Sequence, residues 1–245
     1  MLRVHLPNGI PESAPLIGFA GGGMYISWIM GVAHGMRAGG VPLHRCVFSG
    51  ASAGAVVAGM LACGVDIAAA REFFLSDRES AQCFGSVTGA ATRVRAIVTR
   101  LLETMLPADC ATRCNGRLHV LLCSRQRGLY FQSEFSDKAD VIGAIVASTH
   151  VPYFSDGRYA FDHRGEQHVD GAWHSSRTAV LLPRPRASMR VLIDRCGDDA
   201  DAIDGRPFYD AANREVHIAR YERGMRYAAH LQAEGKLPRP LAVSI

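Results

Sequence analysis

The chain has 245 residues, of which 48% are hydrophobic and 20% are charged, and its formal net charge is +4. This balance is typical of a folded globular protein and excludes fibrous and largely disordered classes. The positive excess is spread along the chain rather than gathered into a basic tract. We therefore expect no nucleic-acid partner, while contact with an anionic membrane surface stays open.

The length favours one large domain over two small ones, so we expect an N-terminal extension over residues 1–14 and a single domain over residues 15–245. The first residues carry Pro11 and Glu12 but no continuous apolar run, which argues against a secretory signal. Seven cysteines form an odd set, so a disulfide framework is not expected. These features together predict a reducing, cytoplasmic location, with peripheral membrane association as an open alternative.

Apolar runs and their punctuation predict the elements in chain order. The first half contains predicted strands over residues 16–20 and 44–48 and predicted helices over residues 24–37, 53–63, 66–78 and 94–105. The second half contains predicted strands over residues 118–123, 129–135, 159–161, 167–169 and 190–194, helices over residues 137–148 and 215–233, and a solvent loop over residues 197–206. Helices alternating with short apolar strands indicate a layered α/β protein with a largely parallel sheet.

The predicted helix 94–105 is amphipathic, with arginines at positions 93, 95 and 100 away from its apolar stripe. Such a stripe could rest on lipid, but it more often packs on a core. The longest charge-free apolar stretch, residues 53–65, is too short to cross a bilayer.

Residues 50–54 read Gly-Ala-Ser-Ala-Gly and lie between a predicted strand and a predicted helix. A nucleophilic serine needs this context, because a sharp strand-to-helix turn exposes the hydroxyl and points a helix N-terminus at it. The flanking glycines relieve crowding at the turn. The string alone is common by chance, so its placement supports the hypothesis that Ser52 is a nucleophile.

Gly21, Gly22 and Gly23 also follow a predicted strand and precede a helix. Successive bare amides there can approach a phosphate or an oxyanion, although a tight turn without a ligand is the alternative. A dinucleotide fingerprint would need a glycine where Ile26 stands, and the Gly-Lys-Ser/Thr of a P-loop is absent. Nucleotide binding is therefore disfavoured.

Asp170 follows the predicted strand 167–169 and precedes Gly171 and Ala172. A carboxylate at a strand end can accept a serine proton, although an isolated Asp-Gly pair more often simply forms a turn. The glycine run, the serine and the aspartate nevertheless occur at three strand ends, where α/β proteins gather their sites. All three together are much rarer by chance than any one of them.

With these motifs the sequence resembles the patatin-like phospholipase domain, particularly its adiponutrin-type branch. The resemblance lies in residues 16–32, 48–58 and 145–173, including Ala-Ser-Thr-His-Val-Pro-Tyr-Phe at 147–154 and His-Val-Asp-Gly at 168–171. It covers about residues 15 to 180 in order. Plant members carry an Arg or Lys shortly after the glycine run, where Met24 and Tyr25 follow here, and Ala172 stands where a third glycine is more frequent.

The resemblance implies a three-layer α/β/α fold with a largely parallel central sheet. It also implies a serine acyl hydrolase for carboxylic esters of glycerolipids, of triacylglycerol lipase or phospholipase A type. By position, Ser52 is the expected nucleophile and Asp170 the expected base, with Gly21, Gly22 and Gly23 as the oxyanion hole. The implied partner is a glycerolipid or phospholipid substrate, and contact with a membrane or lipid-droplet surface is an open alternative.

This chemistry calls for no cofactor and no metal. Cys110 and Cys114 are separated by three residues rather than two, with only His119 nearby, so we expect inert thiols there. We expect core positions for most of five aromatic side chains that could instead line an acyl channel: Trp28, Phe73, Phe74, Tyr153 and Phe154.

Two other functions stay open. An α/β-hydrolase shares the serine turn but needs a histidine after the acid, and His174, His217 and His230 all follow Asp170. A lipid-binding protein without catalytic activity on the same fold is the other alternative.

Overall fold

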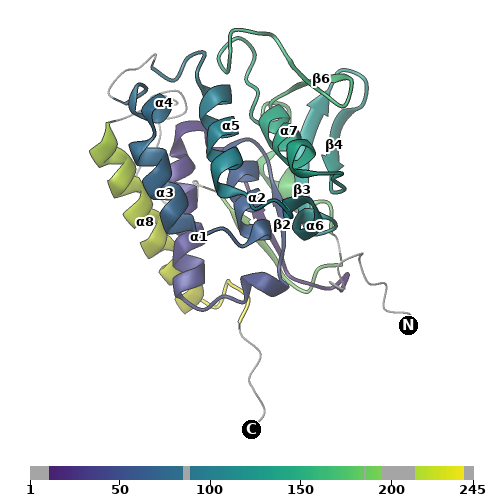
Figure 1. The fold of residues 1–245 in the computed structure, drawn as a ribbon. Helices are drawn as coiled ribbons and strands as arrows, with labels where there is room; N and C mark the ends of the chain where they lie inside the picture. Colours follow the sequence, from purple (N-terminus) through teal and green to yellow (C-terminus); the bar gives the residue numbers. More distant parts are fainter. Residues whose placement is uncertain (1–10, 85–88, 185, 195–212, 240–245) are drawn as a thin grey trace.

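The computed structural model describes residues 11–84, 89–184, 186–194 and 213–239. At its centre lies a sheet in the order β5-β6-β3-β2-β1-β7, with β4 also paired to β3 (Figure 1). The strands are β1 (Leu16–Phe19), β2 (Val47–Gly50), β3 (Leu118–Ser124), β4 (Gly128–Gln132), β5 (Phe161–His163), β6 (Glu166–Val169) and β7 (Arg190–Ile193).

The sheet has a parallel part and an antiparallel edge. Strands β7, β1, β2 and β3 run parallel, which confirms the predicted parallel core. Strands β4 and β6 each pair antiparallel with β3, and β5 pairs antiparallel with β6. Every residue of β1 and β2 is buried, as expected for parallel strands covered on both faces.

Helices cover one face of this sheet (Figure 1). They are α1 (Ile26–Ala38), α2 (Ala53–Cys63), α3 (Ile67–Ser76), α4 (Arg78–Ala81), α5 (Val94–Met105), α6 (Cys110–Cys114), α7 (Lys138–Ser148) and α8 (Arg214–Ala233). Helices α2 and α7 pack directly on the strands, and the other long helices pack around them. No helix in the described ranges is both long enough and apolar enough to cross a membrane.

The opposite face of the sheet is covered by a 3-10 helix, η3 (Arg177–Leu181), which packs over β2, β1 and β7. A Cβ built on Gly18 of β1 would lie only 2.8 Å from a methyl carbon of Leu181, so the contact is close. The predicted three-layer α/β/α architecture is thereby confirmed, with a 3-10 helix forming the third layer in the described part of the chain.

The structure departs from the predicted elements in local detail. The predicted helix 66–78 is broken because Asp77 is extended, with ψ of 137°, so α3 ends at Ser76 and α4 begins at Arg78. The predicted strand 129–135 ends at Gln132, because the amide of Phe135 donates to the Asn115 side chain instead of a neighbouring strand. Helix α6 and η3 were not predicted, and the predicted solvent loop 197–206 lies outside the described residues.

Helix α8 packs along α1 through glycines. A Cβ built on Gly224 would lie 2.2 Å from the carbonyl oxygen of Trp28, and one built on Gly31 would lie 2.0 Å from that of Tyr221. The two helix backbones therefore approach so closely that neither position has room for a side chain. This contact joins the last described helix to the first.

The substitution Gly224→Ala tests this packing. Alanine normally stabilises a helix by about 1 kcal/mol relative to glycine, but here its Cβ would meet backbone. We expect the free energy of unfolding in urea to fall by about 1–3 kcal/mol. The control Ala229→Gly, at an exposed position of α8, should lose only about 1 kcal/mol. A Gly224→Ala protein as stable as the parent would contradict the close contact.

Candidate active site

Ser52 occupies a sharp turn between the end of β2 and the start of α2. Its φ of 54° and ψ of −132° are rare for a residue with a side chain. A Cβ built on Gly54 would lie 2.2 Å from the Phe19 carbonyl oxygen, and one built on Gly50 would lie 2.5 Å from that of Gly54. Close backbone contacts on both sides therefore require the two glycines and hold the serine in its strained conformation.

Asp170 directly follows β6, which runs opposite to β2 and ends close to the end of β2. Strand β2 runs parallel to β3 and ends with Gly50 opposite Val120, whereas β6 runs antiparallel to β3 and ends with Val169 opposite Cys123. Strand β4 pairs with β3 over Val120 to Ser124, so β2 and β6 must share the other edge of β3. Their carboxyl ends meet there, with only two residues of β3 between them.

The carboxylate of Asp170 is buried, with 2% of the residue exposed. Its Oδ1 accepts the amide N–H of Ala172 at 2.7 Å, and Oδ2 is buried without a hydrogen bond of ordinary length and angle from any described residue. Burial raises the pKa of Asp170 to about 6, although the Ser52 hydroxyl and the amides of Ala172 and Trp173 lower it. The structure thus brings Ser52 and Asp170 together.

The glycine run lies beside Ser52, but its members differ in placement. A Cβ built on Gly21 would lie 3.3 Å from the Ser52 Cβ and 2.6 Å from that of Ala172. Gly23 begins the 3-10 helix η1 (Gly23–Tyr25), as Ala53 begins α2, so neither amide has an acceptor within its own helix. A Cβ built on Gly22 would instead lie 3.1 Å from the Cδ1 of Ile29.

Ser148, the last residue of α7, links the two halves of the site. Its Oγ accepts the Ser52 amide at 3.0 Å and donates to the Leu121 carbonyl of β3 at 2.7 Å. Its own carbonyl accepts the Gly171 amide at 3.2 Å. Sequence reasoning assigned it no role, because nothing in a lone serine at a helix end shows which distant backbone groups it will bind.

An apolar cavity of about 60 Å³ adjoins Ser52, Ala53 and Gly23. Four residues of the apolar stripe of α5 line it: Val94, Ile97, Val98 and Leu101. The stripe therefore faces the interior of the protein rather than a lipid surface. Among the five aromatic residues considered for a channel, Phe74 and Phe154 line this cavity.

The other three aromatic residues lie elsewhere. Trp28 is buried and packs against the ring of Tyr227, with the ring centroids 5.3 Å apart. Phe73 packs against the main core, and Tyr153 is 65% exposed.

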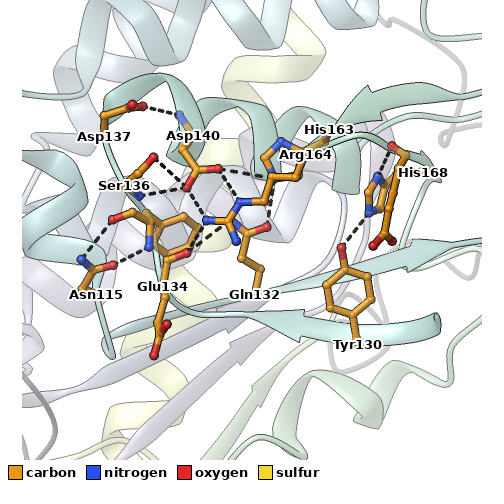
Figure 2. A network of polar contacts seen from close by, with 12 residues as sticks. Asn115, Tyr130, Gln132, Glu134, Ser136, Asp137, Asp140, His163, Arg164 and His168 are labelled. Atoms are coloured by element: carbon orange, nitrogen blue, oxygen red, sulfur yellow. Dashed lines mark hydrogen bonds and ion pairs between the residues drawn. The ribbon is translucent and has the colours of Figure 1, made fainter. Parts of the chain in front are cut away.

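A polar network holds the hairpin of β5 and β6 in place (Figure 2). His168 of β6 meets the Tyr130 hydroxyl of β4 at 2.7 Å, and His163 of β5 meets Gln132 of β4 at 2.9 Å. Arg164, in the turn between β5 and β6, donates to Asp140 of α7 at 2.8 Å. Since Asp170 directly follows β6, this network fixes the strand that carries it.

Within the described residues, no histidine side chain donates a hydrogen bond to the Asp170 carboxylate, as a Ser-Asp-His triad would require. His217 is fully buried and meets the Ser27 hydroxyl at 2.8 Å, and His230 pairs with Glu234 near the end of α8. His174 is exposed. Among the described residues, the groups that shift the pKa of Asp170 are Ser52, Ala172 and Trp173, and none is a histidine.

The chain is an α/β protein with a mostly parallel sheet. A serine on a strand–helix turn lies opposite a buried aspartate at the edge of this sheet. The family model of patatin-like phospholipases matches residues 18–182. The chain belongs to the patatin-like phospholipase family, which confirms the expected family.

Curated relatives agree with this assignment. The chain is 28% identical over 184 residues to an omega-hydroxyceramide transacylase of Mus musculus, covering 69% of this chain and 28% of that protein. It is 34% identical over 160 residues to patatin-like phospholipase domain-containing protein 2 of Rattus norvegicus, covering 63% and 33%. It is 29% identical over 161 residues to patatin-like phospholipase domain-containing protein 4 of Homo sapiens, covering 63% of each chain. The chain thus spans about a third of the length of the first two relatives.

The structure of VipD from Legionella pneumophila is similar over 78% of this chain and 53% of that one, with 13% identity and a TM-score of 0.42.

We expect the buried carboxylate of Asp170 to make the free energy of unfolding depend on pH, and we expect Asp170→Asn to remove that dependence. Because burial raises the folded pKa from 3.8 to about 6, the folded state holds its proton more tightly than the unfolded state. Stability contributed by this group is therefore lost as the pH rises from about 4 to about 6. Asparagine carries no charge, so we expect Asp170→Asn to gain up to about 3 kcal/mol over the parent between pH 4 and pH 7.5.

The measurement is the free energy of unfolding of both proteins at the two pH values. The control is Asp162→Asn, which changes an exposed carboxylate on β5. A difference between Asp170→Asn and the parent that is the same at both pH values would contradict the raised pKa.

Proposed function

We propose that this protein is a serine acyl hydrolase that cleaves carboxylic esters of glycerolipids through a Ser52/Asp170 dyad. The observation that carries the proposal is the meeting of the Ser52 hydroxyl with a buried carboxylate beside an apolar cavity. Membership of the patatin-like phospholipase family supports lipid acyl hydrolysis as the type of reaction. The cavity's lining is almost entirely apolar, and its volume of about 60 Å³ suits the first few carbons of an acyl chain next to the ester.

In the first half of the reaction, the Ser52 Oγ attacks the ester carbonyl carbon while Asp170 accepts its proton. The pKa of about 6 suits this role, since the carboxylate is ionised at neutral pH and is a stronger base than an ordinary aspartate. The tetrahedral intermediate then expels the alcohol, which takes the proton from Asp170. An acyl-enzyme on Ser52 remains.

The negative charge on the carbonyl oxygen needs hydrogen-bond donors in place before the reaction. The amides of Gly21, Gly22 and Gly23 and of Ala53 are our candidates, with Gly23 and Ala53 lining the cavity beside Ser52. The Ser52 amide is engaged by Ser148. Loss of one such donor typically lowers kcat about 100- to 1,000-fold.

In the second half, Asp170 takes a proton from water, the hydroxide attacks the acyl carbonyl, and Ser52 recovers its proton as the fatty acid leaves. A lipid hydroxyl in place of water would transfer the acyl group instead. The relative named omega-hydroxyceramide transacylase makes this a relevant second outcome. The two reactions differ only in the acceptor.

We also propose that residues 15–245 form one domain. The close packing of α8 on α1 and the pairing of β7 with β1 support this, because both join the later part of the chain to its first elements.

Kinetics on a short-chain nitrophenyl ester test the dyad. We expect Ser52→Ala and Asp170→Asn each to lower kcat/KM by about 1,000-fold or more. For the parent, kcat/KM should rise with pH to a plateau, with a midpoint near 6, because only ionised Asp170 accepts the proton. Ser49→Ala, which removes another buried hydroxyl, is the control.

Retention of most activity by either folded variant would contradict the dyad. Loss of turnover in a His174→Ala, His217→Ala or His230→Ala protein would favour a triad instead. Failure of the parent to react with a fluorophosphonate at Ser52 would favour a lipid-binding protein without catalytic activity.

The contacts of Ser148 indicate a positioning role for its hydroxyl. We expect Ser148→Ala to lower kcat about 10- to 100-fold with little change in KM, because the Ser52 turn loses its tie to β3. The midpoint of the pH profile should stay, since Asp170 keeps its own surroundings. Ser148→Thr retains a hydroxyl and should restore most of kcat. A loss in Ser148→Ala no larger than in Ser49→Ala would contradict this role.

A further inference from the structure

The loop over residues 149–160 has two different sides. On the inner side, Val151 and Phe154 line the apolar cavity next to Ser52. On the outer side, Tyr153 is 65% exposed and Tyr159 is 62% exposed, with their ring centroids 5.9 Å apart. The same short loop therefore forms a wall of the cavity and presents a pair of aromatic rings to the outside.

Hydrogen bonds hold this loop in a defined shape. The Ser155 Oγ accepts the Val151 amide at 2.9 Å and donates to the Thr149 carbonyl at 3.1 Å. The Tyr153 amide donates to the Arg158 carbonyl at 2.7 Å. The loop is also tied to the start of α5, where the Arg95 amide donates to the Ser155 carbonyl at 3.1 Å.

Tyr153 adopts a φ of 62°, which is unfavourable for a large side chain. The tyrosine pair is thus held outward by a fixed backbone, and strain of this kind is typically kept at functional positions. Large exposed aromatic side chains next to a cavity often mark an interaction surface.

Arginines outnumber acidic residues near the pair. Residues 90–100 and 149–160 together carry four arginines and one aspartate, although one of these arginines, Arg100, is paired with Asp77 at 2.6 Å. The aspartate, Asp156, is paired with Arg95 at 2.7 Å, and Arg158 lies exposed between the two tyrosines in sequence. Burial lowers the pKa of His150, so this neighbour adds no charge at neutral pH. Tyrosines with nearby arginines suit the headgroup region of an anionic bilayer.

We propose that Tyr153, Arg158 and Tyr159 form a docking surface for an anionic phospholipid bilayer. The proposal rests on the proposed function, since docking there would bring lipid against the loop that walls the acyl cavity. It assigns surface contact to this loop and not to the apolar stripe of α5, which lines the cavity.

Co-sedimentation with vesicles tests the surface. All proteins carry Ser52→Ala, so that Ser52 cannot consume the lipid. The readout is binding and not turnover, so the result does not depend on which residue attacks the ester. The vesicles contain phosphatidylcholine alone or phosphatidylcholine with phosphatidylserine. The aromatic variant combines Tyr153→Asn with Tyr159→Ser, because asparagine tolerates a positive φ. Thermal unfolding and near-UV circular dichroism verify that each variant is folded.

We expect binding to the phosphatidylserine vesicles to fall about tenfold or more in the double tyrosine variant. In Arg158→Gln it should fall about fivefold, the effect of one arginine near a charged surface. Leu182→Ser, at a position 64% exposed beside η3, and Arg226→Gln, on the exposed side of α8, should bind like the parent.

Three results would overturn the proposal. The first is unchanged binding in the folded double tyrosine variant. The second is equal binding to both kinds of vesicle. The third is no binding of the parent to either, which would point to a protein partner for the tyrosine pair.

Discussion

The site depends on one constraint in the sheet, namely that β2 and β6 end against the same edge of β3 from opposite directions. Ser52 and Asp170 lie 118 residues apart in the chain, and neither local turn alone could bring them together. The shared edge does so, and Ser148 ties the Ser52 amide and the Gly171 amide to that edge. The polar network around β5 and β6 stabilises the antiparallel strand that completes the arrangement (Figure 2).

Burial then determines the chemistry that the arrangement supports. Removing Asp170 from solvent raises its pKa, which makes the ionised carboxylate a stronger base but also makes its charge unfavourable for folding. The strength of Asp170 as a base and the local loss of stability therefore share one physical origin, the burial of its carboxylate. The apolar lining of the cavity beside Ser52 comes in large part from α5.

The features of this site that depend on short stretches of sequence could be predicted. Glycines around Ser52 and the position of Asp170 after a strand pointed to both residues, and alternating helices and strands indicated the layered fold. The antiparallel direction of β6 could not be predicted, because strand pairing and register depend on contacts between distant segments. For the same reason Ser148 was missed, and the amphipathic pattern of α5 left open which surface its stripe would contact.

A crystal structure of the parent protein after reaction with an alkyl fluorophosphonate tests this account most directly. The account predicts phosphorus bonded to the Ser52 Oγ, an Asp170 oxygen within hydrogen-bond distance of that Oγ, and the alkyl chain in the cavity beside α5. A phosphonate on a different residue, or an Asp170 carboxylate turned away from Ser52 in the adduct, would contradict it.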